Sequence, residues 1–197
     1  PEMRIPIRES LGLPLDGRVL FHVARVDPMK NHLCLLRAVA DTPNVWLVMI
    51  GRGTDKLPNQ DRVLALGQRS DVRDLLQAGD GIIPSSLYGE GFSNAVSEGM
   101  ACGLVPLATD TGDSCLILGD VGWSFPPNDP DALKASINAF LELTDAELQR
   151  LKNAASERIQ KKFGLPTMAT AYRELYNLPK SDTSESPQSK KFVVKAS

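Results

Sequence analysis

The chain has 197 residues, of which 42% are hydrophobic and 23% are charged, and its formal net charge is -2. These values are typical of a globular protein and support one domain with short appendages. The weak negative charge argues against a protein that binds nucleic acid, and no run approaches the roughly 18 apolar residues of a transmembrane helix.

The elements predicted along the chain alternate between strands and helices. Residues 1–17 contain three prolines and the turn-forming pair Asp16-Gly17, which predict an irregular interdomain linker. Short apolar runs then predict buried strands at residues 19–24, 45–50, 62–66, 81–84, 104–108 and 121–125. Between them, helices are predicted at residues 31–40 and 71–77 and after Ser93.

The last part of the chain is predicted to be helical. Amphipathic patterns cover residues 131–143, 145–163 and 167–178, and Asp129-Pro130 and Thr144 are typical helix starts. The main domain is therefore expected to span residues 18–178. Residues 179–197 are rich in Ser, Lys and Glu, and we expect a disordered tail there.

This alternation predicts an α/β fold with a Rossmann-like parallel sheet flanked by helices, followed by C-terminal helices. Buried parallel strands read as continuous apolar runs, as these do. Ligands bind such sheets beyond the carboxyl ends of the strands. The loops at residues 25–27, 51–53, 67–69 and 85–91 all follow predicted strands, so we expect them to converge on one ligand cleft.

A glycine-rich segment from Glu90 to Gly103 carries two carboxylates eight positions apart. Ser93 is a plausible N-cap, and the unpaired N–H groups and dipole of the helix behind it suit a phosphate. Glu98 lies on that helix and Glu90 just before it, so both can accept hydrogen bonds from ligand hydroxyls. Gly91 suggests a close backbone approach, and Gly103 suits a C-terminal cap. The alternative is an ordinary amphipathic helix with a solvent-facing glutamate at each end.

Two cations stand near the end of the first strand. Arg25 and Lys30 could reach one anion there, because Arg suits bidentate phosphate binding and Lys supplies a compact charge. The alternative is a solvated loop with two exposed cations. Gly51-Arg52-Gly53 is too short for a dinucleotide fingerprint and favours a plain turn.

Other residue types give little evidence for a site. There is no Walker motif and no Gly-x-Ser-x-Gly nucleophile elbow. The three cysteines form no CxxC pair, which predicts buried free thiols and no zinc site. His22 and His32 have no partner at metal spacing and are expected to be structural.

Several motifs in this order resemble the C-terminal donor-binding domain of GT-B glycosyltransferases of family 4, over about Arg18 to Tyr176. They are Val-Ala-Arg-Val-Asp-Pro-Met-Lys-Asn-His (23–32), Ile-Gly-Arg-Gly (50–53), Leu-Gly-Gln-Arg-Ser-Asp-Val (66–72), Pro-Ser-Ser-Leu-Tyr-Gly-Glu-Gly-Phe-Ser-Asn (84–94), Glu-Gly-Met-Ala-Cys-Gly (98–103) and Ala-Thr-Asp-Thr-Gly-Asp (108–113). The chain departs from the family at Gly99, usually Ala, and at Pro106, one place later than usual. These departures predict a weakened helix and an awkward strand.

The resemblance implies a retaining transferase that uses a nucleotide-diphosphate sugar, UDP- or GDP-linked, without a metal or other cofactor. By position, Arg25 and Lys30 would neutralise the diphosphate, and Glu90 would bind sugar hydroxyls without acting as a nucleophile. The remaining donor-binding residues implied are Gly53, Arg69 at the base, Gly91, Phe92, Ser93 and Asn94 at the distal phosphate and sugar, and Glu98 at the ribose.

The resemblance also implies partners. A GT-B enzyme has a second, N-terminal domain that binds the acceptor, so this chain is expected to be the donor-binding half, working with that domain in cis or in trans on a glycan or lipid-linked acceptor in polysaccharide biosynthesis. Its expected location is the cytoplasm or the inner face of the membrane. Alternatives are a non-catalytic nucleotide-sugar-binding module, a partner subunit of a split transferase and a sugar-phosphate epimerase of the same fold.

Overall fold

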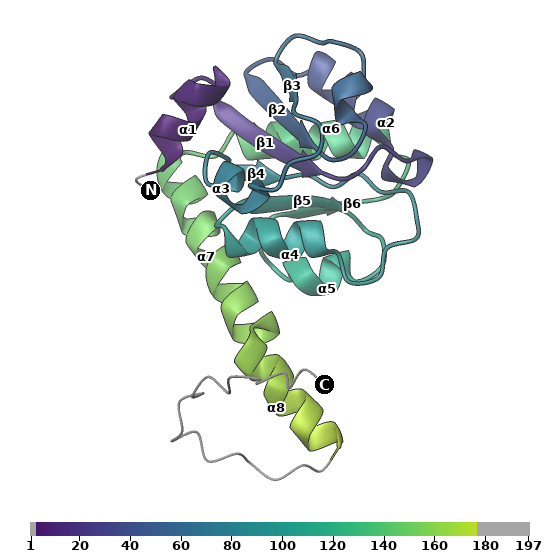
Figure 1. Cartoon of the computed structure of the whole chain (residues 1–197), viewed down its shortest axis with the longest axis vertical. Coiled ribbons are helices and arrows are strands. Elements are labelled where there is room, and N and C mark those ends of the chain that lie inside the picture. The colour runs from purple at the N-terminus through teal and green to yellow at the C-terminus, as the bar shows by residue number, and fades with distance from the viewer. Residues whose placement is uncertain (1–2, 177–197) are drawn as a thin grey trace, which may run out of the picture. The chain divides into compact units, whose positions relative to one another are not determined.

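The computed structural model describes residues 3–176 and contains a six-stranded parallel sheet flanked by helices (Figure 1). All neighbouring strands pair in parallel, in the order β3-β2-β1-β4-β5-β6. The strands are β1 (Arg18–Val23), β2 (Val45–Ile50), β3 (Val63–Ala65), β4 (Gly81–Ile82), β5 (Val105–Thr109) and β6 (Trp123–Phe125). The strand order reverses direction between β1 and β4, as in Rossmann-like folds. The predicted fold class is therefore confirmed.

Most predicted helices are present within a few residues of their expected bounds. They are α2 (His32–Ala40), α3 (Val72–Leu76), α4 (Asn94–Ala101), α6 (Pro130–Leu141) and α7 (Asp145–Phe163). The predicted start signals are confirmed: the Asp129 side chain accepts a hydrogen bond from the N–H of Ala132, and Thr144 forms a capping box with Glu147. The helix α5 (Ser114–Leu118) was not predicted, because its apolar residues are consecutive and show no helical period.

From Phe163 onward the chain forms a second compact unit. Its helix α8 (Leu165–Leu175) begins two residues before the predicted start at residue 167. The predicted disordered tail at residues 179–197 lies outside the described part of the chain. Across residues 3–176, no helix is both long enough and apolar enough to cross a membrane.

The prediction that residues 1–17 are irregular is wrong, because they contain the helix α1 (Arg4–Leu11). Pro6 is compatible with the helix since it lies in the first turn, where its missing N–H costs no hydrogen bond. The helix ends at Gly12, whose φ of 67° is left-handed and whose N–H caps the last turn. Ile7 and Arg8 of this helix are buried against the domain. Its role as an interdomain linker remains a prediction.

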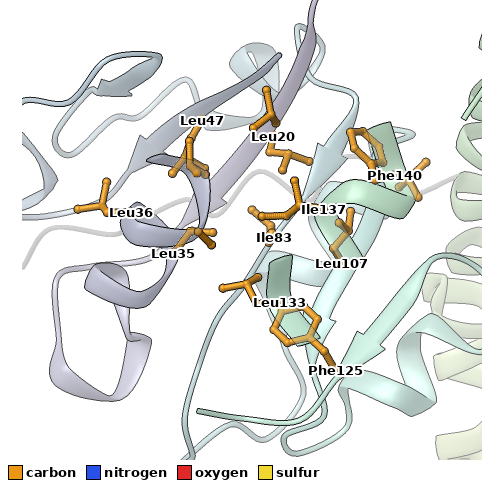
Figure 2. Close-up of a cluster of buried hydrophobic side chains, with 14 of the residues drawn as sticks. Leu20, Leu35, Leu36, Leu47, Ile83, Leu107, Phe125, Leu133, Ile137 and Phe140 are labelled. Carbon is orange, nitrogen blue, oxygen red and sulfur yellow. The ribbon is translucent and has the colours of Figure 1, made fainter. Parts of the chain in front are cut away.

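Alternate side chains of β1 enter two hydrophobic clusters on opposite faces of the sheet. On one face, Leu20 packs with residues of α2 and α6, among them Leu35 and Ile137 (Figure 2). On the other face, Phe21 packs with residues of α1 and α3 such as Leu76. Because both faces are covered, only the ends of the strands remain open to a ligand.

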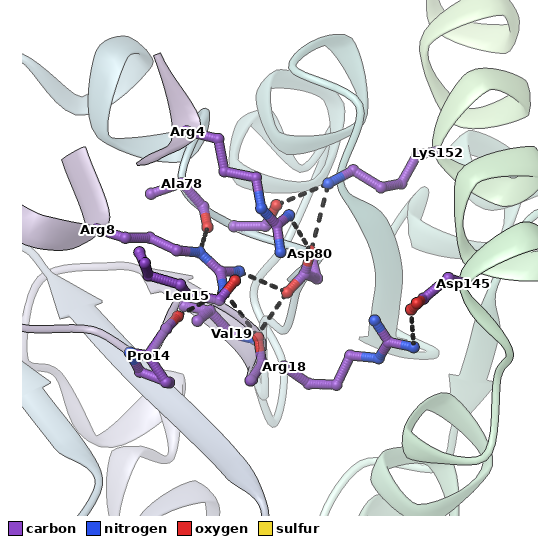
Figure 3. Close-up of polar contacts among 12 residues, drawn as sticks. Arg4, Arg8, Pro14, Leu15, Arg18, Val19, Ala78, Asp80, Asp145 and Lys152 are labelled. Atoms are coloured by element: carbon purple, nitrogen blue, oxygen red, sulfur yellow. Dashed lines mark hydrogen bonds and ion pairs between the residues drawn. The ribbon is translucent and has the colours of Figure 1, made fainter. Parts of the chain in front are cut away.

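The amino end of the sheet is closed by a buried carboxylate, Asp80 (Figure 3). Its side chain is fully buried and accepts bonds from Arg8 Nη2 at 2.7 Å, Arg4 Nη1 at 2.5 Å and the Val19 N–H at 3.0 Å. Lys152 of α7 lies 3.4 Å away. Burial acts to raise the pKa of Asp80, but these cations outweigh it and lower the pKa below its ordinary value. The cluster ties α1 and α7 to this end of the sheet.

The two unusual residues noted in the sequence have local explanations. A Cβ on Gly99 would lie 2.7 Å from the Cβ of Ile82, so glycine permits α4 to approach β4 closely. Near Pro106, Val105 and Thr109 donate their N–H groups toward the β4 side, to the carbonyls of Asp80 and Pro84. Because N–H groups alternate between the two sides of a strand, an N–H at position 106 would point toward β6. Pairing with β6 begins only at residue 107, so the missing N–H of Pro106 removes no hydrogen bond from the sheet.

Candidate functional site

Loops from the carboxyl ends of the strands are bonded to one another, as the sequence predicted. The Val26 N–H donates to the Arg52 carbonyl at 2.9 Å, and the Gly51 N–H donates to the Gly67 carbonyl at 2.8 Å. The loop after β4 joins the loop after β1 through the bond from the Leu87 N–H to the Met29 carbonyl, at 2.7 Å. These bonds bring four separate segments of the chain to one edge of the sheet.

The loop after β1 is shaped by Asp27. Its carboxylate caps the short 3-10 helix η1 (Pro28–Lys30) by accepting a hydrogen bond from the Met29 N–H at 3.0 Å, and it also contacts Arg25 Nη2 at 3.2 Å. The Lys30 carbonyl in turn accepts a hydrogen bond from Ser85 Oγ at 2.8 Å. These hydrogen bonds fix the conformation of the loop that carries Arg25 and Lys30 at the carboxyl end of β1.

A pocket of about 320 Å³ opens at this edge. It brings together the side chains or backbone of the predicted site residues Arg25, Lys30, Glu90, Phe92, Ser93 and Asn94, with His22, Val23, Ala24, Pro84, Ser86 and Ala95 completing its wall. Two cations, one carboxylate and a helix start thus share one crevice. Such a combination can hold an anionic group that carries hydroxyls beside it.

Lys30 and Glu90 form an ion pair in this pocket. Glu90 Oε1 accepts hydrogen bonds from both Lys30 Nζ and Ser86 Oγ. Partial burial acts to raise the pKa of Glu90, but the bonds from Lys30 and Ser86 outweigh it and lower the pKa below its ordinary value. Glu90 is therefore ionised at neutral pH and holds Lys30 in place. The sequence pattern did not predict this pairing, because the two residues are 60 positions apart.

The start of α4 forms another part of the pocket wall. Ser93 occupies the predicted N-cap position, with φ of -75° and ψ of 98°, but its side chain makes no capping hydrogen bond. The first N–H groups of a helix have no partner within the helix. Because Ser93, Asn94 and Ala95 line the pocket, this helix end faces the space in which an anion would sit.

The backbone around Gly91 is held by the loop after β5. The Asp113 N–H donates to the Gly91 carbonyl at 3.1 Å, and a Cβ on Gly112 would lie 2.4 Å from the Glu90 carbonyl oxygen. Gly112 has φ of 55°, so both its conformation and this close approach require glycine. A Cβ on Gly91 itself would meet no atom within 4 Å. The backbone of Gly91 is thus approached closely by the loop after β5, whereas the space where its side chain would lie is open.

Gly91 and three other predicted residues are not among those that line this pocket. Glu98 is exposed and lines a separate hollow with Arg73, Leu76, Ala101 and Cys102. Arg69 is held by Asp71 through two bonds, of 2.8 and 2.6 Å. Gly53, with φ of 90°, packs beside Val26. The structure places these three residues at the margins of the pocket loops and does not bring them into contact with Lys30 or Glu90.

The sequence analysis missed two residues that belong to the pocket. Ser86 binds Glu90, and His22 lies in the pocket wall. A signal for His22 was present, because it is the one polar side chain in the apolar run from Val19 to Ala24. The cysteines are free thiols but partly exposed, so the prediction that they are buried is wrong. Within residues 3–176, no three His, Cys, Asp or Glu side chains gather as metal ligands would.

Comparison with protein families gives one match to most of the chain. The model of the family described as glycosyl transferases group 1 matches residues 3–158. D-inositol 3-phosphate glycosyltransferase of Mycobacterium leprae is 34% identical over 129 residues, which are 57% of this chain and 30% of that protein. Lipopolysaccharide core biosynthesis glycosyltransferase LpsD of Rhizobium meliloti is 27% identical over 187 residues, which are 86% of this chain and 52% of that protein. The chain thus spans about a third to a half of the length of these relatives.

Solved structures share the fold. Anabaena Alr3699/HepE in complex with UDP superposes with a TM-score of 0.80 at 24% identity, covering 90% of this chain and 53% of that one. A glycosyltransferase from Rickettsia africae superposes with a TM-score of 0.79 at 23% identity, covering 90% of this chain and 52% of that one. A structure of HepE with UDP-glucose also superposes, with a TM-score of 0.77.

Proposed function

Because the chain belongs to the glycosyl transferases of group 1, we propose that it binds a nucleotide-diphosphate sugar and takes part in transferring the sugar to an acceptor. The observation that carries this proposal is the pocket itself, in which Arg25 and Lys30 face the start of α4 across about 320 Å³. A diphosphate placed between these cations and α4 would contact Arg25 and Lys30 on one side and the first backbone N–H groups of the helix on the other.

The pocket would have to rearrange slightly when an anion enters. Lys30 is paired with Glu90, whereas the Arg25 side chain is 53% exposed. An incoming diphosphate would first meet Arg25, and Lys30 Nζ has three hydrogens with which to bond a phosphate oxygen while keeping Glu90. Glu90 would then hold Lys30 in position while the other hydrogens of Nζ bond the ligand.

In the proposed reaction, an acceptor hydroxyl oxygen bonds to the sugar's anomeric carbon as the bond between that carbon and a phosphate oxygen breaks. The nucleoside diphosphate leaves with the bonding electrons and takes up the proton that the acceptor hydroxyl loses. Negative charge grows on the diphosphate as it leaves, and fixed cations and amides stabilise that charge most in the transition state. Arg25 and Lys30 would supply this stabilisation. Retention of configuration at the anomeric carbon follows from the resemblance to family 4 and is part of the proposal.

The ligand hydroxyls would bind on the carboxylate side of the site. The bonds from Lys30 and Ser86 both reach Oε1 of Glu90, so Oε2 is the oxygen proposed to accept a sugar hydroxyl. Glu98 is proposed for the ribose, at the far side of the α4 start. Arg69 and Gly53 are proposed to border the base. No role as a nucleophile is proposed for Glu90, because its carboxylate already holds Lys30.

Transfer would need more than this chain. The relatives are two to three times longer than the segments they share with it, and we propose that an N-terminal acceptor-binding domain, in cis or in trans, completes the active site. UDP and UDP-glucose are bound in the HepE structures, which supports a UDP-linked donor, with GDP as the other candidate. The named relatives are a glycosyltransferase of lipopolysaccharide core biosynthesis and a D-inositol 3-phosphate glycosyltransferase, which supports a role in building glycans or lipid-linked sugars. A location in the cytoplasm or at the inner face of the membrane is part of the proposal.

A second candidate is a nucleotide-sugar-binding module without catalysis of its own. The pocket, with two cations beside a helix start, would bind a donor in such a module as it would in a transferase. A coding sequence for an acceptor domain adjoining Pro1 would favour the transferase. Its absence, together with donor binding by the chain alone, would favour the module.

Calorimetric titration of the chain with UDP-, GDP- and ADP-sugars tests donor binding. We expect one of them to bind with micromolar to millimolar affinity, and Lys30→Ala to weaken that binding by about tenfold or more, since a charge-assisted hydrogen bond contributes about 1.5–3 kcal/mol. Lys134→Ala is the matched control, because Lys134 lies on α6 outside the residues that line the pocket. Equal affinity of the parent chain and Lys30→Ala would contradict the proposed site.

A further inference from the structure

The two histidines of the chain lie together beneath the pocket. His22 is 1% exposed and lines the pocket, and His32 of α2 is 4% exposed. Their ring centroids are 4.7 Å apart, and the ring planes meet at 82°, an edge-to-face contact. His22 Nδ1 lies 2.8 Å from the carbonyl oxygen of Ile83. The orientation of the His22 ring is therefore fixed from two sides.

The bond to Ile83 determines which nitrogen of His22 carries the hydrogen. A carbonyl oxygen only accepts, so Nδ1 must be the donor, and in the neutral ring Nε2 is left with a lone pair. Burial, with smaller contributions from His32 and Lys30, outweighs the Ile83 bond and lowers the pKa of His22 to about 3. The ring is therefore neutral at physiological pH, and Nε2 is a hydrogen-bond acceptor.

Within residues 3–176 this acceptor has no partner, and neither ring nitrogen of the adjacent His32 has one. Buried polar atoms are nearly always hydrogen-bonded, and an unpaired one is unfavourable unless a water or ligand supplies the missing bond. The atom belongs to a residue in the pocket wall, close to Lys30 and Glu90, where the ligand is proposed to bind. The missing partner must be a hydrogen-bond donor.

We propose that His22 Nε2 accepts a hydrogen bond from a hydroxyl group of the bound nucleotide sugar. The inference rests on the proposed function and adds a residue to its site. An ionised phosphate cannot be the partner, because its oxygens have no hydrogen to donate. A hydroxyl of the sugar or of the ribose has one. His32 acts as a positioning residue that holds the His22 ring by its edge-to-face contact.

Nitrogen NMR of the chain labelled with ¹⁵N-histidine reads this bond directly. With two histidines there are four ring resonances, and His32→Phe identifies those of His22 while keeping an aromatic ring beside it. In the free chain, we expect Nε2 of His22 to have the chemical shift of an unprotonated nitrogen. This resonance should move upfield when UDP-glucose binds, or when the GDP- or ADP-linked sugar binds if the chain prefers that donor. Inorganic pyrophosphate, which carries no hydroxyl bound to carbon, is expected to leave it in place.

The nucleotide arms distinguish the two sources of the hydroxyl. A shift with UDP that is lost with 2′,3′-dideoxy-UDP assigns the bond to the ribose, and a shift only with UDP-glucose assigns it to the sugar. Either result supports the inference, whereas an equal shift with dideoxy-UDP would assign the bond to an N–H of the base and would overturn it. Saturation with UDP-glucose without a shift of Nε2 would overturn it, as would an equal shift with pyrophosphate or a protonated Nε2 in the complex.

Two substitutions separate the bond from the fold. In His22→Asn the amide nitrogen takes the place of Nδ1 and can still donate to Ile83, but Nε2 is gone; His22→Gln returns an amide group to the position of Nε2. We expect His22→Asn to weaken UDP-glucose binding by about 2- to 10-fold, the value of one neutral hydrogen bond, with pyrophosphate affinity unchanged and partial recovery in His22→Gln.

Equal losses for pyrophosphate and UDP-glucose in His22→Asn would overturn the inference, because they would indicate a damaged pocket. The inference and the proposed function fail in different ways. If the parent chain binds no nucleotide or nucleotide sugar, the proposed function fails and the inference fails with it. If the chain binds them and the chemical shift of His22 Nε2 does not change, only the inference fails.

Discussion

Replacing Asp80 by asparagine should destabilise the fold more than any other single charge removal described above. Asp80 is fully buried, and its two carboxylate oxygens receive Arg4, Arg8, Lys152 and the Val19 N–H. The Arg8 side chain is also fully buried. The asparagine would keep the shape but would leave these cations without a counter-charge and would turn amide hydrogens toward the arginines.

The expected loss is about 3–5 kcal/mol, the range found when one partner of a buried ion pair is removed. For a chain of this size, this corresponds to a fall of about 6–20 °C in the melting temperature. The pKa of Asp80 is lowered in the folded chain, so its contribution is complete above about pH 4 and is lost as the pH falls through the folded pKa. Asp80→Asn should therefore also flatten the acid side of the stability profile.

Thermal unfolding followed by circular dichroism measures both effects. The matched control is Asp145→Asn, because Asp145 pairs with Arg18 at 2.9 Å in the same region but is 94% exposed (Figure 3). We expect this control to lower the melting temperature by less than about 2 °C. Similar melting temperatures for the two variants would refute the reasoning that burial decides the difference.

Four further substitutions address the site and its supports. Gly99→Ala should destabilise the chain by about 1–3 kcal/mol in denaturant unfolding, because its Cβ would press on Ile82, whereas Gly91→Ala should leave stability within about 0.5 kcal/mol; equal losses would contradict the packing described. Glu98→Ala should weaken UDP binding without changing pyrophosphate binding in calorimetry, and unchanged UDP affinity would remove Glu98 from the proposed site. Because the pKa of His22 is lowered to about 3, the unfolded chain binds a proton that the folded chain rejects, so stability should fall by about 1 kcal/mol between pH 6 and pH 5 through this residue. His22→Asn should remove this contribution in urea unfolding and leave that of His32, whose pKa is also lowered by burial, and an unchanged slope would show that His22 is not its source.

The sheet could be predicted because each buried strand is a continuous apolar run with a turn after it. The segment from Val45 to Ile50 shows this most clearly, and the observed β2 has the predicted bounds. The helix α1 could not be predicted from its pattern, since its stability depends on Arg8, whose partner Asp80 is 72 positions away. A charged residue in a short segment with prolines carries no local sign of such a partner.

In the site, too, local patterns were predicted from the sequence and long-range contacts were not. Its position at the strand ends follows from the fold class, and Arg25, Lys30 and Glu90 were predicted and do line one pocket. The ion pair between Lys30 and Glu90 depends on how the loops after β1 and β4 bond to each other, through Leu87 and Met29, which no periodicity encodes.

A crystal structure of the chain with its tightest-binding nucleotide sugar tests the central claim most directly. The account predicts the diphosphate at the carboxyl edge of the sheet, within hydrogen-bonding distance of Lys30 Nζ and of the first N–H groups of α4. A nucleotide bound instead in the hollow lined by Arg4, Lys152 and Ser156, at the opposite end of the sheet, would contradict it.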